Sequence, residues 1–150
     1  MKVYDSLRDR LKNQHEAIPA IISGAGQKIF TRPQPEKWSI HDNIAHLAKY
    51  QPIFIERINS ILKNEDPVFE RYSAESDPEF ESWRKWETNK LLSRLNTDRK
   101  QIFDLITSLP ENKIKRIGIH KKFGRLTIVQ WTEFFLLHEA HHLLTIFGLV

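Results

Sequence analysis

The C-terminal segment LLHEAHHLLTIFGLV, residues 136–150, carries two histidines within an otherwise apolar helical pattern. His138 and His142 lie four residues apart, so a helix places both imidazoles on one face, where they can bind the same metal ion. With Glu139 they match H-E-x-x-H, the helix motif of zinc proteases, in which the glutamate is the general base. Such a protease takes its third ligand from further along the chain.

The eight residues after His142 contain no His, Asp or Glu, which counts against a peptidase. A third ligand therefore has to come from upstream. His46 is the best candidate, because it lies in the middle of a second helical pattern beside the apolar positions Ile44 and Leu47. The remaining histidines are weaker candidates for the third ligand. His15 lies beside charged residues, His41 is expected to be exposed near a helix start, and His120 lies in a basic segment. His141 is turned about 100° from His142 around the helix.

A packed, hydrogen-bonded histidine is more common than a ligand. On the residues alone, a three-histidine metal site and three structural histidines both remain open.

Four long helical patterns predict an all-α fold. They cover residues 3–23, 39–62, about 81–108 and 127–147. Ser39 with Asp42, and Thr127 with Gln130, have the spacing of capping boxes at two helix starts. Pro52 is expected to kink its helix about one turn earlier. The segment from Lys113 to Thr127 is expected to form a small hairpin or an extended loop. We expect one domain over residues 1–150, an antiparallel four-helix bundle with long crossover connections.

Composition narrows the function. Of the 150 residues, 40% are apolar and 28% are charged, the balance of an ordinary soluble domain. The chain has no cysteine, which excludes disulfides, thiolate ligands and a cysteine nucleophile. The net charge is +4, but basic and acidic residues alternate outside the cluster Lys113–Arg125, which disfavours nucleic-acid binding. There is no membrane-length apolar run and no signal-peptide pattern, so a cytoplasmic location is expected.

Two motifs carry a family resemblance. PEKWSIHDNIAHLAKYQ, residues 35–51, resembles the second-helix signature of the DinB-like (YfiT-like) superfamily, with Trp38-Ser39 at the helix start and His46-Leu47 about two turns later. LLHEAHHLLTI, residues 136–146, resembles the last-helix signature, two histidines four apart followed by an apolar turn. The resemblance covers essentially the whole chain in order and length.

This resemblance implies a four-helix bundle with a divalent metal held by His46, His138 and His142, and makes the H-E-x-x-H match incidental. Members of the superfamily are described as metal-dependent hydrolases. Some are transferases or isomerases that use bacillithiol, mycothiol or glutathione, and members often form dimers. For this chain it implies zinc or nickel, a small-molecule substrate, a homodimer and, for a transferase, an external low-molecular-weight thiol.

The ligand faces also suggest a substrate pocket. Tyr50, Trp131 and Phe135 lie at helical spacing from the histidines and are expected to line it, although aromatic residues at such spacing are more often core. Glu139 points toward the surface or a dimer interface in this scheme, and no general base can be assigned. The alternative interpretation is a non-catalytic metal- or ligand-binding helical bundle.

Overall fold

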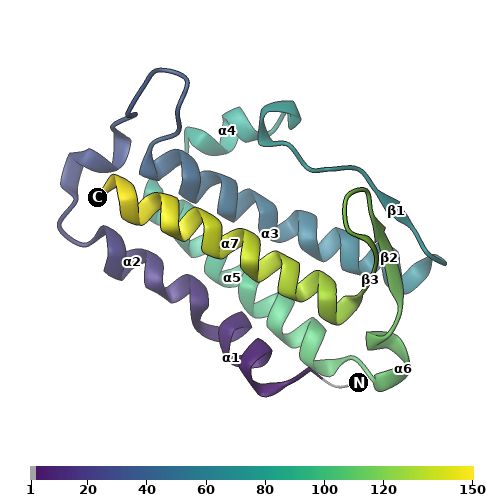
Figure 1. Ribbon diagram of the computed structural model, residues 1–150. Helices are drawn as coiled ribbons and strands as arrows, with labels where there is room; N and C mark the ends of the chain where they lie inside the picture. The colour runs from purple at the N-terminus through teal and green to yellow at the C-terminus, as the bar shows by residue number, and fades with distance from the viewer. Residues whose placement is uncertain (1–2) are drawn as a thin grey trace.

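Four long helical segments form a bundle in the computed structural model, which describes residues 3–150 (Figure 1). The first segment consists of α1 (Asp5–Asn13), a 3₁₀ turn and α2 (Ala17–Ile22), and the others are α3 (Ile40–Lys63), α5 (Thr88–Ser108) and α7 (Ile128–Leu149). Two short helices, α4 (Phe80–Arg84) and α6 (Glu111–Ile114), lie in the connections. The expected all-α bundle with long crossovers is confirmed. Among the described residues, no helix has the length and apolar character needed to cross a bilayer.

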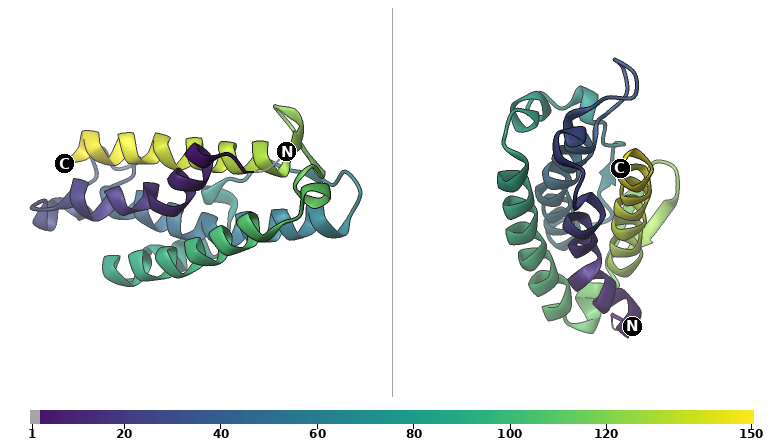
Figure 2. Two further views of the ribbon diagram at one scale, coloured as in Figure 1. Left: turned by 90° about the horizontal axis from the view of Figure 1, so that it is seen from below. Right: turned by 90° about the vertical axis from the view of Figure 1, so that its left-hand side faces the viewer.

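The helices are not simply antiparallel. His41 at the start of α3 bonds Thr88 at the start of α5, so these two packed helices run in the same direction. In contrast, His46 meets His138 while Asn43 meets His142, so α7 runs antiparallel to α3. Figure 2 shows α5 and α7 on opposite sides of the bundle. The expectation of antiparallel order is thus wrong for α3 and α5, because residues 64–87 return the chain along the bundle before α5 begins.

Proline explains one break that the helical pattern did not predict. Residues 3–23 were expected to form one helix, yet a 3₁₀ turn at Gln14–Glu16 separates α1 from α2. Pro19 has no N–H to donate, and its ring crowds the carbonyl of His15, four residues earlier. Pro52, in contrast, lies inside α3 without interrupting it.

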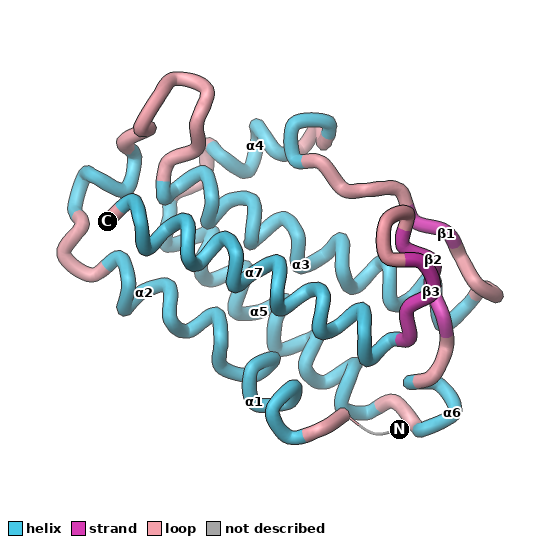
Figure 3. The backbone as a smooth tube through the Cα atoms, in the orientation of Figure 1, coloured by secondary structure: helices cyan, strands magenta, loops and turns pink. Residues whose placement is uncertain are grey.

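A small three-stranded sheet covers one end of the bundle (Figure 3). Strands β2 (Ile117–His120) and β3 (Gly124–Thr127) form the hairpin, the first of the two forms expected for this segment. The parallel strand β1 (Val68–Phe69) lies in the connection after α3 and had no sequence signal. Gly118 lets β2 approach the helices, because a Cβ there would lie 2.7 Å from the Ile61 side chain and 2.8 Å from Trp131 Nε1.

The buried interior has two apolar clusters with a polar layer between them. One cluster gathers around Leu11, Phe54, Ile102 and Phe135, and the other around Ile18, Leu47, Leu95 and Ile146. Between these positions on the four long segments lie the buried side chains of His15, Gln51, Arg99 and Glu139. The first half of α3 is the centre of the fold, since every residue from 40 to 51 is buried.

Candidate metal centre

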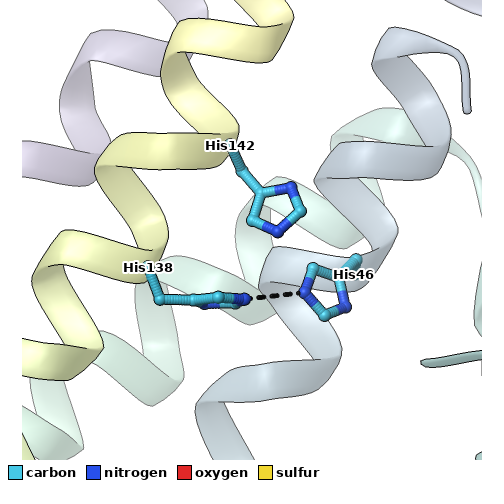
Figure 4. A group of neighbouring side chains, drawn as sticks. All are labelled: His46, His138 and His142. Carbon is cyan, nitrogen blue, oxygen red and sulfur yellow. Dashed lines mark hydrogen bonds between the residues drawn. The ribbon is translucent and has the colours of Figure 1, made fainter. Parts of the chain in front are cut away.

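Two helices bring three histidines together. His46 lies on α3, while His138 and His142 lie one turn apart on α7 (Figure 4). Both helix starts are set by the expected capping boxes: Asp42 N–H donates to Ser39 Oγ, and Gln130 N–H donates to Thr127 Oγ1. One ring nitrogen from each histidine lies within 4.8 Å of the others. The structure therefore places the three sequence-predicted ligands in one cluster.

The geometry of this cluster fits a metal ion. Nε2 of His46 and Nε2 of His138 are 3.0 Å apart. Two nitrogens that bind one tetrahedral zinc ion at about 2.1 Å lie roughly 3.4 Å from each other, so this pair is close to ligand spacing. The Nδ1 atoms of both rings are buried without a hydrogen-bond partner among the described residues, so no neighbouring side chain orients these two rings.

Burial keeps the three rings neutral. Burial lowers the pKa of His46 to about 2, with a further contribution from the neighbouring His142 and His138. Burial likewise lowers the pKa of His138 to about 3 and that of His142 to about 4, in each case with help from other histidines. Neutral imidazoles are the form that binds metal, because a protonated ring has no free lone pair.

Asn43 orients one of the three rings. Its Oδ1 lies 2.9 Å from Nδ1 of His142, and its Nδ2 donates to the carbonyl oxygen of Ser39 over 2.8 Å. Because the amide nitrogen is engaged by Ser39, the amide oxygen faces His142 and accepts the Nδ1–H proton. This hydrogen bond selects the tautomer whose Nε2 lone pair is free for a metal.

A cavity of about 820 Å³ opens beside the three histidines. Aromatic rings frame it: the Tyr50 ring lies 4.5 Å from the His138 ring, Tyr72 stacks on His46 at 5.9 Å, and Trp38 stacks on His142 at 6.1 Å. Of the three residues expected to line a substrate pocket, Tyr50 lines this cavity.

The other two expected wall residues do not line this cavity. Trp131 and Phe135 are each 1% exposed and belong to the apolar core, where Phe135 stacks on Tyr50. Trp131 instead donates from Nε1 to the carbonyl of Gly118. Both share the helical face of His138, but other groups cover them: Phe135 packs against Tyr50 and Phe54, and Trp131 against Phe69. Phe134, next to Phe135, lines the cavity instead.

Glu139 is buried rather than exposed, which corrects its expected placement at the surface or an interface. Its carboxylate is 1% exposed, forms an ion pair with Arg99 and accepts from Gln14 Nε2. Arg99 also donates to Gln51 Oε1 and to the carbonyl of Leu11. This pairing holds Glu139 in the polar layer, so it does not serve as the base that a zinc protease requires.

The remaining histidines lie outside the cluster. His41, expected to be exposed, is 5% exposed, and its two ring nitrogens bond Thr88 Oγ1 and the carbonyl of Arg84 at 2.7 Å each. His15 is also buried, beside Arg99, and burial lowers its pKa to about 4. His120 and the exposed His141 line the outer cavity.

Several residues around the cluster were not singled out from the sequence. Asn43 had a signal, since it lies three residues before His46 and therefore on the same helical face. No feature of the sequence pointed to Tyr72 or Arg57. Tyr72 comes from the long connection after α3, whose path over the site is set by tertiary packing, and its hydroxyl donates to Asp77 over 2.8 Å.

Comparisons with known proteins agree with this arrangement. A family model of the DinB superfamily matches residues 5–146. The uncharacterized protein YuaE of Bacillus subtilis (strain 168) is 30% identical over 129 residues, and the match covers 78% of this chain and 80% of YuaE.

Among solved structures, YfiT from Bacillus subtilis is described as a probable metal-dependent hydrolase with an unusual four-helix bundle topology. It matches with a TM-score of 0.76 and 19% sequence identity, over 99% of this chain and 88% of YfiT. At that identity the likeness shows a shared fold. The family match along nearly the whole chain and the similarity to YuaE show that the chain belongs to the DinB superfamily.

Proposed function

We propose that this protein is a metal-dependent enzyme that acts on a small molecule, with His46, His138 and His142 as the metal ligands. The observation that carries the proposal is the position of three neutral imidazoles beside a cavity of about 820 Å³. Three protein ligands leave further coordination positions for reactants, as in catalytic zinc sites, whereas structural sites are closed by four. The cavity thus favours an enzyme over the alternative of a metal- or ligand-binding protein without activity.

Zinc and nickel suit the ligand set, because both accept imidazole nitrogen and the chain offers no thiolate. A divalent ion held there supplies Lewis acidity, which lowers the pKa of a water molecule or a thiol toward neutrality. The chain's own contribution is to orient the ligands through Asn43 and to shield the site with Tyr50, Tyr72 and Trp38. Burial raises the pKa of Tyr50, so its hydroxyl stays protonated and can donate a hydrogen bond to substrate.

Hydrolysis is the first candidate reaction. It is supported by the likeness to YfiT, described as a probable metal-dependent hydrolase. Transfer to an external low-molecular-weight thiol is the second candidate. The absence of cysteine means that such a thiol would have to enter the cavity from solution.

Metal content tests the ligand assignment. Protein purified without an affinity tag is analysed by elemental mass spectrometry, as wild type and as His46→Ala, His138→Ala and His142→Ala. We expect close to one metal ion per chain in wild type and loss of the metal in each variant. His141→Ala is the matched control, since this exposed neighbour on α7 lies outside the cluster, and it should keep the metal.

Two results would contradict the proposal. Wild type that stays metal-free after incubation with zinc or nickel would leave the histidines structural. Metal retained in His46→Ala but lost in the other two would mean that the third ligand is wrong. If the metal site stands, hydrolase substrates and thiol-transfer substrates are then screened on the metal-loaded protein.

A homodimer is also part of the proposal. Leu137, Leu144 and Phe147 are apolar residues of α7, and each is more than 60% exposed. Several exposed apolar side chains on one helix are expected where another subunit packs against it. Light scattering coupled to size exclusion would measure the mass, and a monomer at micromolar concentration would rule this part out.

A further inference from the structure

The cavity beside the histidine cluster has an unbalanced charge. Four of its lining residues are cationic, namely Arg57, Arg71, Lys121 and Lys122, while Glu75 is its one acidic lining residue. Lys121 is offset by Glu70, with Nζ and Oε1 3.1 Å apart. The remaining positive charge would attract an anion, because a concave site of one sign concentrates ligands of the other.

Arg57 is the most deeply placed of these cations. It is half-buried and lies on α3, seven residues after Tyr50 and eleven after His46, so the three share one helical face. Its Nη2 donates to the carbonyl oxygen of Glu70 over 2.8 Å, and its Nη1 lies 3.4 Å from the Tyr50 hydroxyl. The guanidinium carbon lies 5.6 Å from the Phe69 ring and 5.7 Å from the Trp131 ring.

None of these contacts neutralises the charge of Arg57. Among the residues that the structure describes, no carboxylate forms an ion pair with it. Buried arginines are normally paired, since desolvation of an unpaired charge is costly. Arg57 is therefore positioned by neutral groups and keeps its charge available to a ligand.

Arg57 is also close to the candidate metal centre. Its guanidinium lies beside the hydroxyl of Tyr50, and the ring of Tyr50 lies 4.5 Å from the ring of His138. Its positive charge also lowers the pKa of His120, after the larger effect of burial. A ligand of a few atoms could thus contact Arg57 and the histidine cluster at once.

His120 adds a neutral donor to the same wall. Its Nδ1 accepts from the backbone N–H groups of Lys122 and Phe123, at 3.0 and 3.1 Å. In the neutral ring, Nε2 therefore carries the proton, and it forms no hydrogen bond with any described residue. The hairpin turn thus fixes His120 as a hydrogen-bond donor beside the cavity.

We propose that the substrate is a small anion whose carboxylate or phosphate group binds Arg57, with His120 as a second donor, while its reacting group lies at the three histidines. The inference rests on the proposed function in that it names the substrate class of the same site. The guanidinium suits both groups, because each offers two oxygens to its paired N–H donors. Tyr50, Tyr72 and Phe134 would contact the apolar body of such a molecule.

Three probes with one aromatic body test this assignment: benzoate, phenylphosphonate and neutral benzamide. Their dissociation constants are measured by isothermal titration calorimetry, on zinc-loaded protein and on protein stripped with a chelator. In the stripped protein an anion has no ion to bind, so a preference for anions there reports the cationic wall. We expect benzoate or phenylphosphonate to bind at least about tenfold more tightly than benzamide, the effect of one charge-assisted hydrogen bond. The tighter of the two anions distinguishes a carboxylate from a phosphate substrate.

Variants of Arg57 test whether this residue causes the preference for anions over benzamide. Arg57→Gln should abolish the preference, and Arg57→Lys, which keeps the charge, should retain part of it. Arg8→Gln is the matched control, because it removes one charge from an exposed position on α1 and should leave the preference unchanged. Circular dichroism verifies that each variant is folded.

The proposal is overturned if no anion binds at millimolar concentration, if benzamide binds as well as the anions, or if the preference survives in folded Arg57→Gln. An Arg57-dependent preference in a wild type that never takes up metal would instead refute the metal-dependent enzyme and keep the anion site. The two proposals can therefore fail separately.

Discussion

Asn43 connects the N-terminal turn of α3 to a candidate ligand on α7. Its amide nitrogen donates to Ser39, inside the capping box, and its amide oxygen accepts from His142. A residue in the first turn of α3 therefore also sets the tautomer of a histidine 99 positions later in the chain. Groups that hold the far nitrogen of a metal-binding histidine normally tune affinity as well as orientation.

Asn43→Ala should weaken zinc binding by about 10- to 100-fold, because the ring of His142 loses the acceptor that fixes its tautomer. Asn43→Asp keeps an acceptor and should bind zinc more tightly than Asn43→Ala. Competition with a chromophoric chelator measures the affinities. Asn89→Ala, at an exposed position of α5, is the control. Unchanged affinity in Asn43→Ala would mean that His142 is not a ligand through Nε2.

Among the elements, strand β2 packs closely against the helices because Gly118 has no side chain. Gly118 packs directly against Ile61 of α3 and Trp131 of α7, and its carbonyl accepts from the indole of Trp131. This contact seats the hairpin at the end of the bundle. His120, two residues later on β2, then reaches the cavity.

Gly118→Ala should destabilise the fold by about 1–3 kcal/mol, the usual range for overpacking a tight contact. The added Cβ would lie under 3 Å from both Ile61 and Trp131, so one of them has to shift. Thermal unfolding measures the effect. Gly148→Ala in α7 is the matched control, since its Cβ meets nothing within 4 Å, and it should be neutral or slightly stabilising. Equal melting temperatures for the two variants would show that β2 is not held at Gly118.

For the whole molecule, the Arg99–Glu139 pair holds the four long segments in register. Arg99 of α5 contacts Glu139 of α7, Gln51 of α3, and both Leu11 and His15 of the first segment. The side chains of Glu139, Gln51 and His15 lie between the two apolar clusters. A shift of any one helix along its axis would leave a buried charge or amide without a partner, so the polar layer disfavours other alignments.

Glu139→Ala should destabilise the metal-free protein by about 3–5 kcal/mol, because it leaves the charge of Arg99 buried and unpaired. The double variant Arg99→Met/Glu139→Leu should recover most of this loss, since it replaces the pair with apolar groups. Urea unfolding measures the free energies. If the double variant were as unstable as Glu139→Ala, an unpaired charge would not be the cause. If the folded Arg99→Met/Glu139→Leu variant keeps hydrolase activity, Glu139 is not the catalytic base.

The sequence by itself determined what depends on contacts within a helical turn. The capping boxes at Ser39 and Thr127 and the shared face of His138 and His142 follow from spacings of three and four residues, and all are present in the structure. His46 could be nominated as their partner from its place in the second helix and from family resemblance.

Only the tertiary structure decided how distant segments meet. The first half of α3 packs against α4, α5, α7 and the segment Gly26–Phe30, and this packing buries His41 against expectation. The same packing turns Glu139 toward Arg99 and brings Tyr72, Arg57 and His120 to one cavity. The physical reason is that helical periodicity defines which residues share a face, while the choice of the neighbour that covers that face depends on the path of the connections and on the packing of all four segments together.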